Sequence, residues 1–140
     1  MTGSQFQDIL NGLSKGWTNR DYRSVTDFFS EDVRYADPLR YSFSGRAALR
    51  TFFEADEGRE QKTEFHTVIF DEERQIAAVE YTYEGSHRYH GVALVRLRDG
   101  LITHWREYQH VDERPWAEFI SGTQFPAGRE KGPEAPWEGQ

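Results

Sequence analysis

The chain has 140 residues, no cysteine and a formal net charge of -7 at pH 7, and 15% of its residues are aromatic. This length fits a single domain, the missing cysteines exclude disulfides and thiolate metal sites, and the lack of a Lys/Arg cluster argues against nucleic acid as a partner. No apolar stretch approaches the roughly 18 residues of a membrane span and the N-terminus does not resemble a leader, so we expect no membrane association and a cytoplasmic location by default.

The first half of the chain predicts three helices and one short strand. Apolar residues at three- and four-residue steps over 6–17 predict a first helix, and Asp21 can cap a second, shorter helix. Residues 33–37 alternate between apolar and polar and then meet a proline, which predicts a short strand that ends there. After a loop, a third helix is predicted between a cap at Ser44 and a closing Gly58.

From residue 62 onward the apolar period changes from helical to two, which predicts strands. The predicted strands cover residues 62–70, 75–84, 87–98 and 101–111. Their connections are short, and Asp99-Gly100 is a typical two-residue hairpin turn, so the sheet is predicted to be mostly antiparallel. Asp112 can cap a last short helix. Residues 123–140 are rich in Pro and Gly and poor in aliphatic side chains, which predicts an irregular tail.

Helices followed by a meander of strands indicate an α+β domain, in which the N-terminal helices cover one face of a curved sheet. Such a sheet wraps around a cone-like space. The sheet and the helices diverge at one end, so inward side chains there are expected to line a pocket.

Three segments, "NRDYRSVTDFFSEDVRYADP", "SGRAALRTFF" and "DGLITHWREYQHVD", resemble the SnoaL-like members of the nuclear transport factor two-like superfamily. The resemblance covers about residues 5–121. It implies a cone-shaped α+β barrel, with residues 1–122 as one SnoaL-like domain. The superfamily includes steroid isomerases, polyketide cyclases, epoxide hydrolases, dehydratases and members with no evident catalysis, so it implies several possible chemistries.

The resemblance lays the functional residues of two enzyme classes on this chain. The general base of the steroid isomerases falls on Asp37, whereas their oxyanion-stabilising Tyr falls on Leu13 and the protonated Asp that assists it falls near Ala93. The side chains of Leu13 and Ala93 donate no hydrogen bond. In the limonene-type epoxide hydrolases, the water-holding Tyr, Asn and Asp fall on Tyr35, Asp37 and Glu107.

The proton-donating Arg and Asp of those hydrolases fall on Tyr81 and Tyr83. The resemblance also implies that these two strand residues face the cavity. It also implies that Glu107 of the last strand faces the cavity. Strand alternation places Trp105 and Gln109, two residues away on either side, on the same face.

Asp37, Glu107 and Tyr35 are therefore the candidate catalytic residues. A carboxylate among Trp and Tyr side chains is desolvated, which raises its pKa and suits acid–base chemistry near neutral pH. The alternatives are that Glu107 accepts a bond from a tyrosine and only orders the core, and that Asp37 bonds its own turn. The candidate substrate-binding residues are Trp17, Phe52, His66, Val79, Tyr81, Tyr83, Trp105 and Gln109.

The five histidines are scattered, and His104 and His110 alternate to the face opposite Glu107. No pattern brings three metal ligands together, so we expect no metal and no other cofactor. His66 could face inward beside Tyr35, although a histidine satisfied within the core is the alternative.

The leading functional hypothesis is a metal-independent acid–base enzyme that acts on a small, mostly apolar molecule with a few oxygens. Isomerisation, cyclisation, hydration, dehydration and epoxide opening all stay open. The alternative is a non-catalytic ligand-binding or dimerisation module of the same fold. The outer sheet face with Arg96, Arg106, Tyr108 and His110 is aromatic and rich in guanidinium groups, so we expect a homodimer rather than a solvated charged face.

Overall fold

The computed structural model describes residues 1–122, and the predicted tail of residues 123–140 lies outside the described part. The helices are α1 (Gly3–Thr18), α2 (Tyr22–Thr26), α3 (Arg46–Glu54) and α4 (Trp116–Phe119). The strands are β1 (Phe29–Asp37), β2 (Tyr41–Ser44), β3 (Lys62–Asp71), β4 (Ile76–Glu84), β5 (Arg88–Arg98) and β6 (Leu101–Val111). None of the helices within residues 1–122 is long and apolar enough to cross a membrane.

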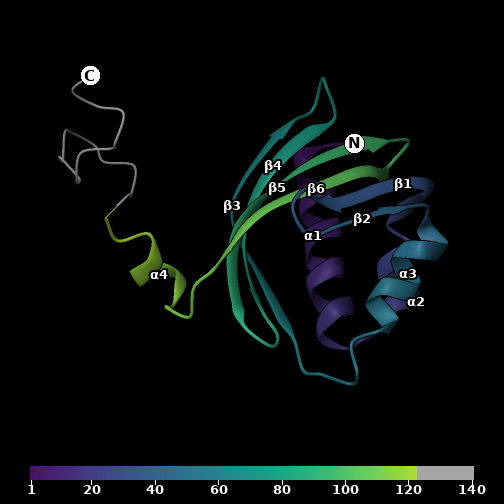
Figure 1. The fold of residues 1–140 in the computed structure, drawn as a ribbon. Coiled ribbons are helices and arrows are strands. Elements are labelled where there is room, and N and C mark those ends of the chain that lie inside the picture. The colour runs from purple at the N-terminus through teal and green to yellow at the C-terminus, as the bar shows by residue number, and fades with distance from the viewer. Residues whose placement is uncertain (123–140) are drawn as a thin grey trace, which may run out of the picture.

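All six strands form one curved, open sheet in the order β2-β1-β6-β5-β4-β3. Only the β1–β6 pair is parallel, and every other neighbouring pair is antiparallel. Helices α1, α2 and α3 lie on the concave side of the sheet, and α4 lies on the convex side (Figure 1). The predicted class is thus confirmed: a cone-shaped α+β fold, with a mostly antiparallel sheet wrapped around N-terminal helices.

Helix α1 begins at a capping box and buries one apolar stripe. The Thr2 side chain accepts from the Gln5 backbone N–H, and the Gln5 side chain accepts from the Thr2 N–H. Gly12 and Gly16 of this helix, which weaken a helix in isolation, lie where α2 and the segment after it pack closely. A Cβ on Gly12 would come within 2.4 Å of the Phe28 ring, so only glycine fits without a shift.

The solid core and the open space lie at opposite ends of α1. Near its N-terminus, the Phe6 ring stacks on Phe70 with centroids 4.9 Å apart, and Leu10 is fully buried. Near its C-terminus, Trp17 meets Trp105 of β6 edge to face, at 6.1 Å. Both of these tryptophans line the cavity. The space inside the sheet is therefore filled by a solid core near the N-terminus of α1 and opens into a cavity near its C-terminus.

The segment after Pro38 differs from the predicted loop. It turns back as β2, which pairs with β1 so that Tyr41 lies opposite Asp37. The N-cap of α3 is Gly45 and not Ser44, because the backbone there has a φ of 95° that glycine adopts without strain.

Helix α4 also begins later than predicted, after Pro115, so Asp112 does not cap it. The Asp112 carboxylate instead accepts from the Arg114 guanidinium at 2.8 Å. Helix α4 rests on the convex face of the sheet, where Trp116 stacks on His66 and Phe119 stacks on His90. The helix is therefore on the opposite side of the sheet from the cavity.

Candidate active site

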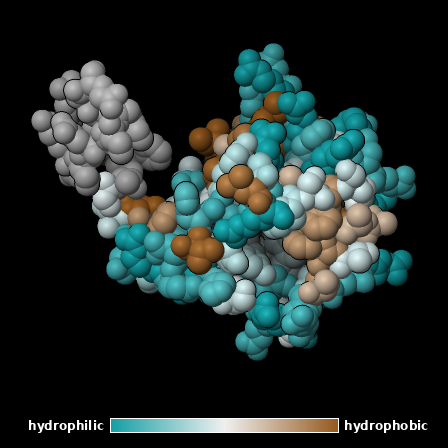
Figure 2. Space-filling view, in the orientation of Figure 1, coloured by the Kyte–Doolittle hydropathy of each residue, from teal (hydrophilic) through white to brown (hydrophobic). Residues whose placement is uncertain are grey.

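A cavity of about 300 Å³ lies between the concave sheet face and the helices. Its size is at the lower end of the range of small-molecule pockets, roughly 300–1,000 Å³. Figure 2 shows the surface hollowed between the sheet and the helical side, with weakly apolar side chains gathered on the helical side. The aromatic lining consists of Trp17, Tyr22, Tyr35, Tyr41, Phe52, Phe53, Phe65, Tyr81, Tyr83, Tyr89 and Trp105. A mostly flat, apolar molecule is the kind of ligand that such walls accommodate.

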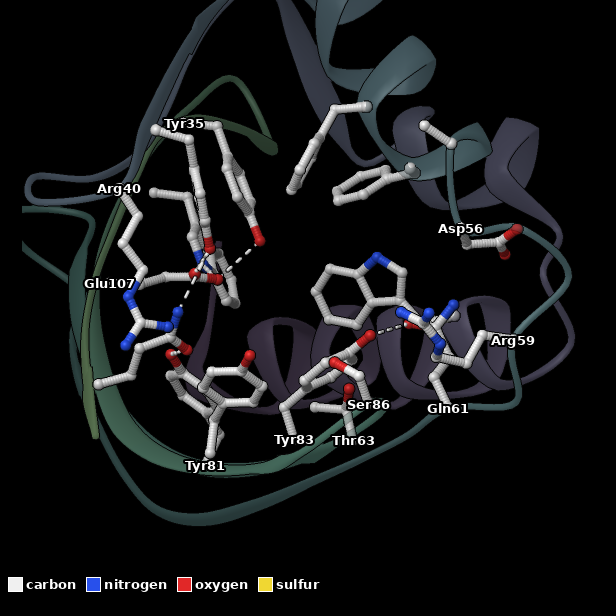
Figure 3. Close-up of a pocket in the computed structure, with 18 of the residues that line it drawn as sticks. Tyr35, Arg40, Asp56, Arg59, Gln61, Thr63, Tyr81, Tyr83, Ser86 and Glu107 are labelled. Atoms are coloured by element: carbon white, nitrogen blue, oxygen red, sulfur yellow. Dashed lines mark hydrogen bonds between the residues drawn. The ribbon is translucent and has the colours of Figure 1, made fainter. Parts of the chain in front are cut away.

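Glu107 is the buried carboxylate of this cavity, with only 7% of its surface exposed. The Tyr35 hydroxyl donates to its Oε1 at 2.6 Å, and the Trp105 indole N–H donates to the same oxygen at 2.9 Å. The Tyr41 hydroxyl donates to Oε2. Figure 3 shows the tyrosine hydroxyls directed at the carboxylate. Three neutral donors thus hold this side chain in place at the cavity wall.

Sheet geometry explains why these groups meet. Tyr35 of β1 is paired in parallel register with Trp105 of β6, and their rings stack with an interplanar angle of 3°. Strand alternation places Glu107 on the same face two residues later. The β1–β2 turn then returns Tyr41 to the same corner of the cavity.

Burial raises the pKa of Glu107 above its ordinary value. The hydrogen bonds from Tyr35, Tyr41 and Trp105 oppose this shift because they favour the ionised form, and the nearby Asp37 carboxylate adds to it. Burial, with Glu107 close by, also raises the pKa of Tyr35 and Tyr41, so both stay protonated donors at neutral pH. The environment therefore moves Glu107 toward neutrality while its partners remain acids.

Asp37 is also buried, with 5% of its surface exposed, but it is not part of the cavity wall. Its Oδ1 accepts from the Leu39 backbone N–H at 3.1 Å, as a turn-forming Asp does. Its Oδ2 accepts from the Gln109 amide at 3.1 Å and lies 3.8 Å from the Arg40 guanidinium. Asp37 thus takes part in its own turn and also reaches the cavity through Gln109.

Gln109 connects the two carboxylates. Its Nε2 donates to Asp37 and lies 3.4 Å from the Tyr41 hydroxyl, which in turn donates to Glu107. Its Oε1 accepts from the Tyr81 hydroxyl at 2.6 Å. The two candidate carboxylates therefore belong to one hydrogen-bonded network, and only Glu107 presents its oxygens to the cavity.

Six of the expected substrate-binding residues line the cavity: Trp17, Phe52, Tyr81, Tyr83, Trp105 and Gln109. Val79 faces the same way, but it is fully buried in the core and is not part of the lining. The expected inward position of His66 is wrong. Because Phe65 points inward, alternation turns His66 to the convex face, where its Nε2 bonds the Thr82 hydroxyl at 2.7 Å and its ring stacks on Trp116.

Several cavity residues escaped the sequence analysis, above all Tyr41, Gln61 and Thr63. Tyr41 lies in the segment that was expected to be a loop, although the alternation of Tyr41 and Phe43 was a usable signal for a strand. Gln61 directly precedes β3, and sequence alone gives no reason to place it in the wall. Within residues 1–122, no group of three or more His, Asp or Glu side chains is arranged to hold a metal ion.

Comparisons with known proteins agree with this geometry. The profile of the SnoaL-like domain family matches residues 11–105. No curated protein matches the chain at a significant level.

Solved structures with the same fold include an LEH-like epoxide hydrolase of M. tuberculosis, with a TM-score of 0.66, 17% identity, and coverage of 76% of this chain and 84% of that one. A Δ5-3-ketosteroid isomerase from Mycobacterium sp. has a TM-score of 0.64 and 17% identity, with coverage of 74% and 92%. An NTF2-like protein of unknown function from Burkholderia xenovorans has a TM-score of 0.68 and 16% identity, with coverage of 89% and 97%. Identities this low show a shared fold and no particular activity.

Proposed function

The chain belongs to the SnoaL-like domain family, and from this premise we propose that it is a small-molecule enzyme of acid–base type, acting on a largely apolar substrate in its cavity. The observation that carries the proposal is Glu107. Its carboxylate is buried at the cavity wall, its pKa is raised by burial, and neutral donors hold it in one orientation. A carboxylate with these properties is suited to take a proton at neutral pH.

The hydrogen-bond inventory leaves Glu107 room to act. An ionised carboxylate offers about four lone-pair positions. Within the described residues, Tyr35 and Trp105 use two positions on Oε1, and Tyr41 uses one on Oε2. The remaining position on Oε2 is available for the proton of a water molecule or of the substrate.

Two apolar side chains, Leu13 and Ala93, favour addition of water over isomerisation through an enolate. The family resemblance lays the oxyanion-stabilising residues of the steroid isomerases on Leu13 and near Ala93. Both side chains are fully buried and donate nothing to a developing oxyanion. In epoxide opening, Glu107 would take one proton from water, the water oxygen would bond to the epoxide carbon, and the carbon–oxygen bond would break. The released oxygen would take a proton from Tyr81 or from solvent.

A panel of small molecules tests this proposal. The protein is incubated with cyclic and aryl epoxides, α,β-unsaturated ketones and tertiary alcohols in water labelled with heavy oxygen, and the products are measured by mass spectrometry. We expect at least one epoxide or enone to gain a single labelled water. If no compound of the panel changes, and native mass spectrometry of the purified protein finds a ligand bound unmodified, the proposal is wrong.

That outcome would favour the second candidate, a ligand-binding module. One observation supports this candidate: the protein's own donors already satisfy three acceptor positions of Glu107, an arrangement also typical of a purely structural buried carboxylate.

We also propose that the outer sheet face forms a homodimer. Leu94 and Tyr108 are 38% and 48% exposed there, and the Arg106 guanidinium lies 5.8 Å from the centre of the Tyr108 ring. An exposed aromatic beside an arginine is typical of interface centres. Sedimentation equilibrium at tens of micromolar should give twice the chain mass of 16.4 kDa, and Tyr108→Glu should reduce this mass by half. A wild-type species of 16.4 kDa would contradict the dimer.

A further inference from the structure

The cavity has a second polar end, on the side away from Glu107. Figure 3 shows Glu107, Tyr35 and Arg40 on one side of the cavity, and Gln61 and Arg59 on the other. Aromatic rings form the walls between the two ends. A substrate that fills this space therefore meets polar groups at both of its ends.

The second end is built as a chain of hydrogen bonds. The Tyr83 hydroxyl donates to Gln61 Oε1 at 3.0 Å, Gln61 Nε2 donates to the Tyr22 hydroxyl at 2.6 Å, and that hydroxyl donates to the Asp56 carboxylate. This chain fixes the orientation of the Gln61 amide. Its Nε2 carries two hydrogens, and one of them remains for a bound acceptor.

Arg59 supplies a second hydrogen-bond donor at this end. The Arg59 guanidinium lines the cavity and is held only loosely, 3.8 Å from the largely exposed Glu57 carboxylate.

The charges at this end favour a neutral acceptor. The Arg59 cation and the Asp56 carboxylate both line the cavity there, so their fields oppose each other. A carboxylate ligand would gain from Arg59 and lose against Asp56. A carbonyl oxygen accepts hydrogen bonds without that repulsion.

We propose that Gln61 and Arg59 form a subsite that binds a carbonyl oxygen of the substrate, at the end remote from the group that reacts at Glu107. The claim that a substrate group reacts at Glu107 rests on the proposed function, whereas the carbonyl-binding subsite does not. The substrate class is then an elongated alicyclic or aromatic molecule that carries a ketone or ester carbonyl at its far end. About a dozen non-hydrogen atoms fit a cavity of 300 Å³.

Binding measurements test the subsite without any need for turnover. The probes are 4-phenylcyclohexanone and its isostere 1-methylene-4-phenylcyclohexane, which has a methylene group in place of the carbonyl oxygen. Binding is followed by quenching of tryptophan fluorescence, because Trp17 and Trp105 both line the cavity. The wild type should bind the ketone about five- to tenfold more tightly than the isostere, as expected for one or two hydrogen bonds.

Two variants assign that preference to the subsite. Gln61→Leu and Arg59→Met should each reduce the affinity for the ketone toward that for the isostere, and leave the affinity for the isostere within about twofold. The preference should persist in Glu107→Gln and in Arg74→Met, a matched control in the turn between β3 and β4 whose side chain is 77% exposed.

Equal affinity of the wild type for the two probes, or no saturable quenching by either, would overturn the proposal. So would a preference that survives in both subsite variants or disappears in Glu107→Gln, because the carbonyl would then bind at the Glu107 end. If only the proposed catalytic function is wrong, the result differs: the protein would still prefer the ketone probe, but no compound of the turnover panel would react.

Discussion

Replacing Glu107 with Gln should lower kcat by about 10²- to 10⁴-fold, the usual contribution of a positioned general base. The amide has nearly the same shape as the carboxylate, so the change removes the proton acceptor and leaves the cavity almost unaltered. Turnover is measured on the substrate that the panel identifies. Glu64→Gln is the matched control, because Glu64 is an exposed residue of β3 that is not part of the cavity lining, and its kcat should not change.

The pH dependence of the same reaction provides a second readout. Only the ionised form of Glu107 accepts a proton, and burial raises its pKa, so activity should fall as the pH drops through that raised value. In Tyr41→Phe, the ionised form loses one hydrogen bond, which should move the acidic limb to higher pH. A Glu107→Gln variant that retains full turnover would contradict the assignment of the base.

Gly91→Ala should cause one of the largest losses of stability in the described part of the chain. A Cβ at this position would lie 2.4 Å from the Tyr108 carbonyl oxygen and 2.8 Å from the Gln109 Cβ on the neighbouring strand β6. The first contact is with backbone, so it is relieved only if β5 and β6 move apart. We expect a loss of about 2–3 kcal/mol in the free energy of unfolding, which lowers Tm by on the order of 10 °C.

Thermal unfolding followed by circular dichroism measures this effect. Gly122→Ala is the control, because a Cβ there has no neighbour within 4 Å, and its Tm should stay within about 2 °C of the wild type. If both alanine variants unfold at the wild-type temperature, the β5–β6 packing is looser than described. Because Gln109 lies beside this contact, a displaced β6 should also weaken its bond to Asp37.

The sheet could be predicted from sequence because the apolar residues of its strands recur mostly with period two. The inward positions of Tyr81, Tyr83, Trp105 and Glu107 follow from period two once the sheet is placed on the helices. The stripe of α1 was equally readable. Gly12 is a different case: glycine weakens a helix in isolation, whereas its role here is to let Phe28 approach, and sequence does not display that contact.

The missed parts of the site depend on local backbone geometry. Proline at position 38 ends β1 in sequence terms, but the chain turns back at once and pairs as β2, which is how Tyr41 reaches Glu107. His66 was assigned to the cavity because of its chemistry, although Phe65 beside it is the residue that points inward. The register between β3 and β4 also shifts between Phe65 and Val68, which no pattern in the sequence announces.

The proposed activity requires Glu107 to be an acid–base group whose pKa is raised by its cavity. The most direct measurement is an NMR titration of its side-chain carboxyl carbon, assigned by the loss of the signal in Glu107→Gln. The midpoint should lie above the ordinary glutamate value of 4.5, and in Asp37→Asn it should move to lower pH because the nearby negative charge is removed. A midpoint at or below 4.5 that Asp37→Asn leaves unchanged would contradict the acid–base assignment and would leave Glu107 as a structural acceptor.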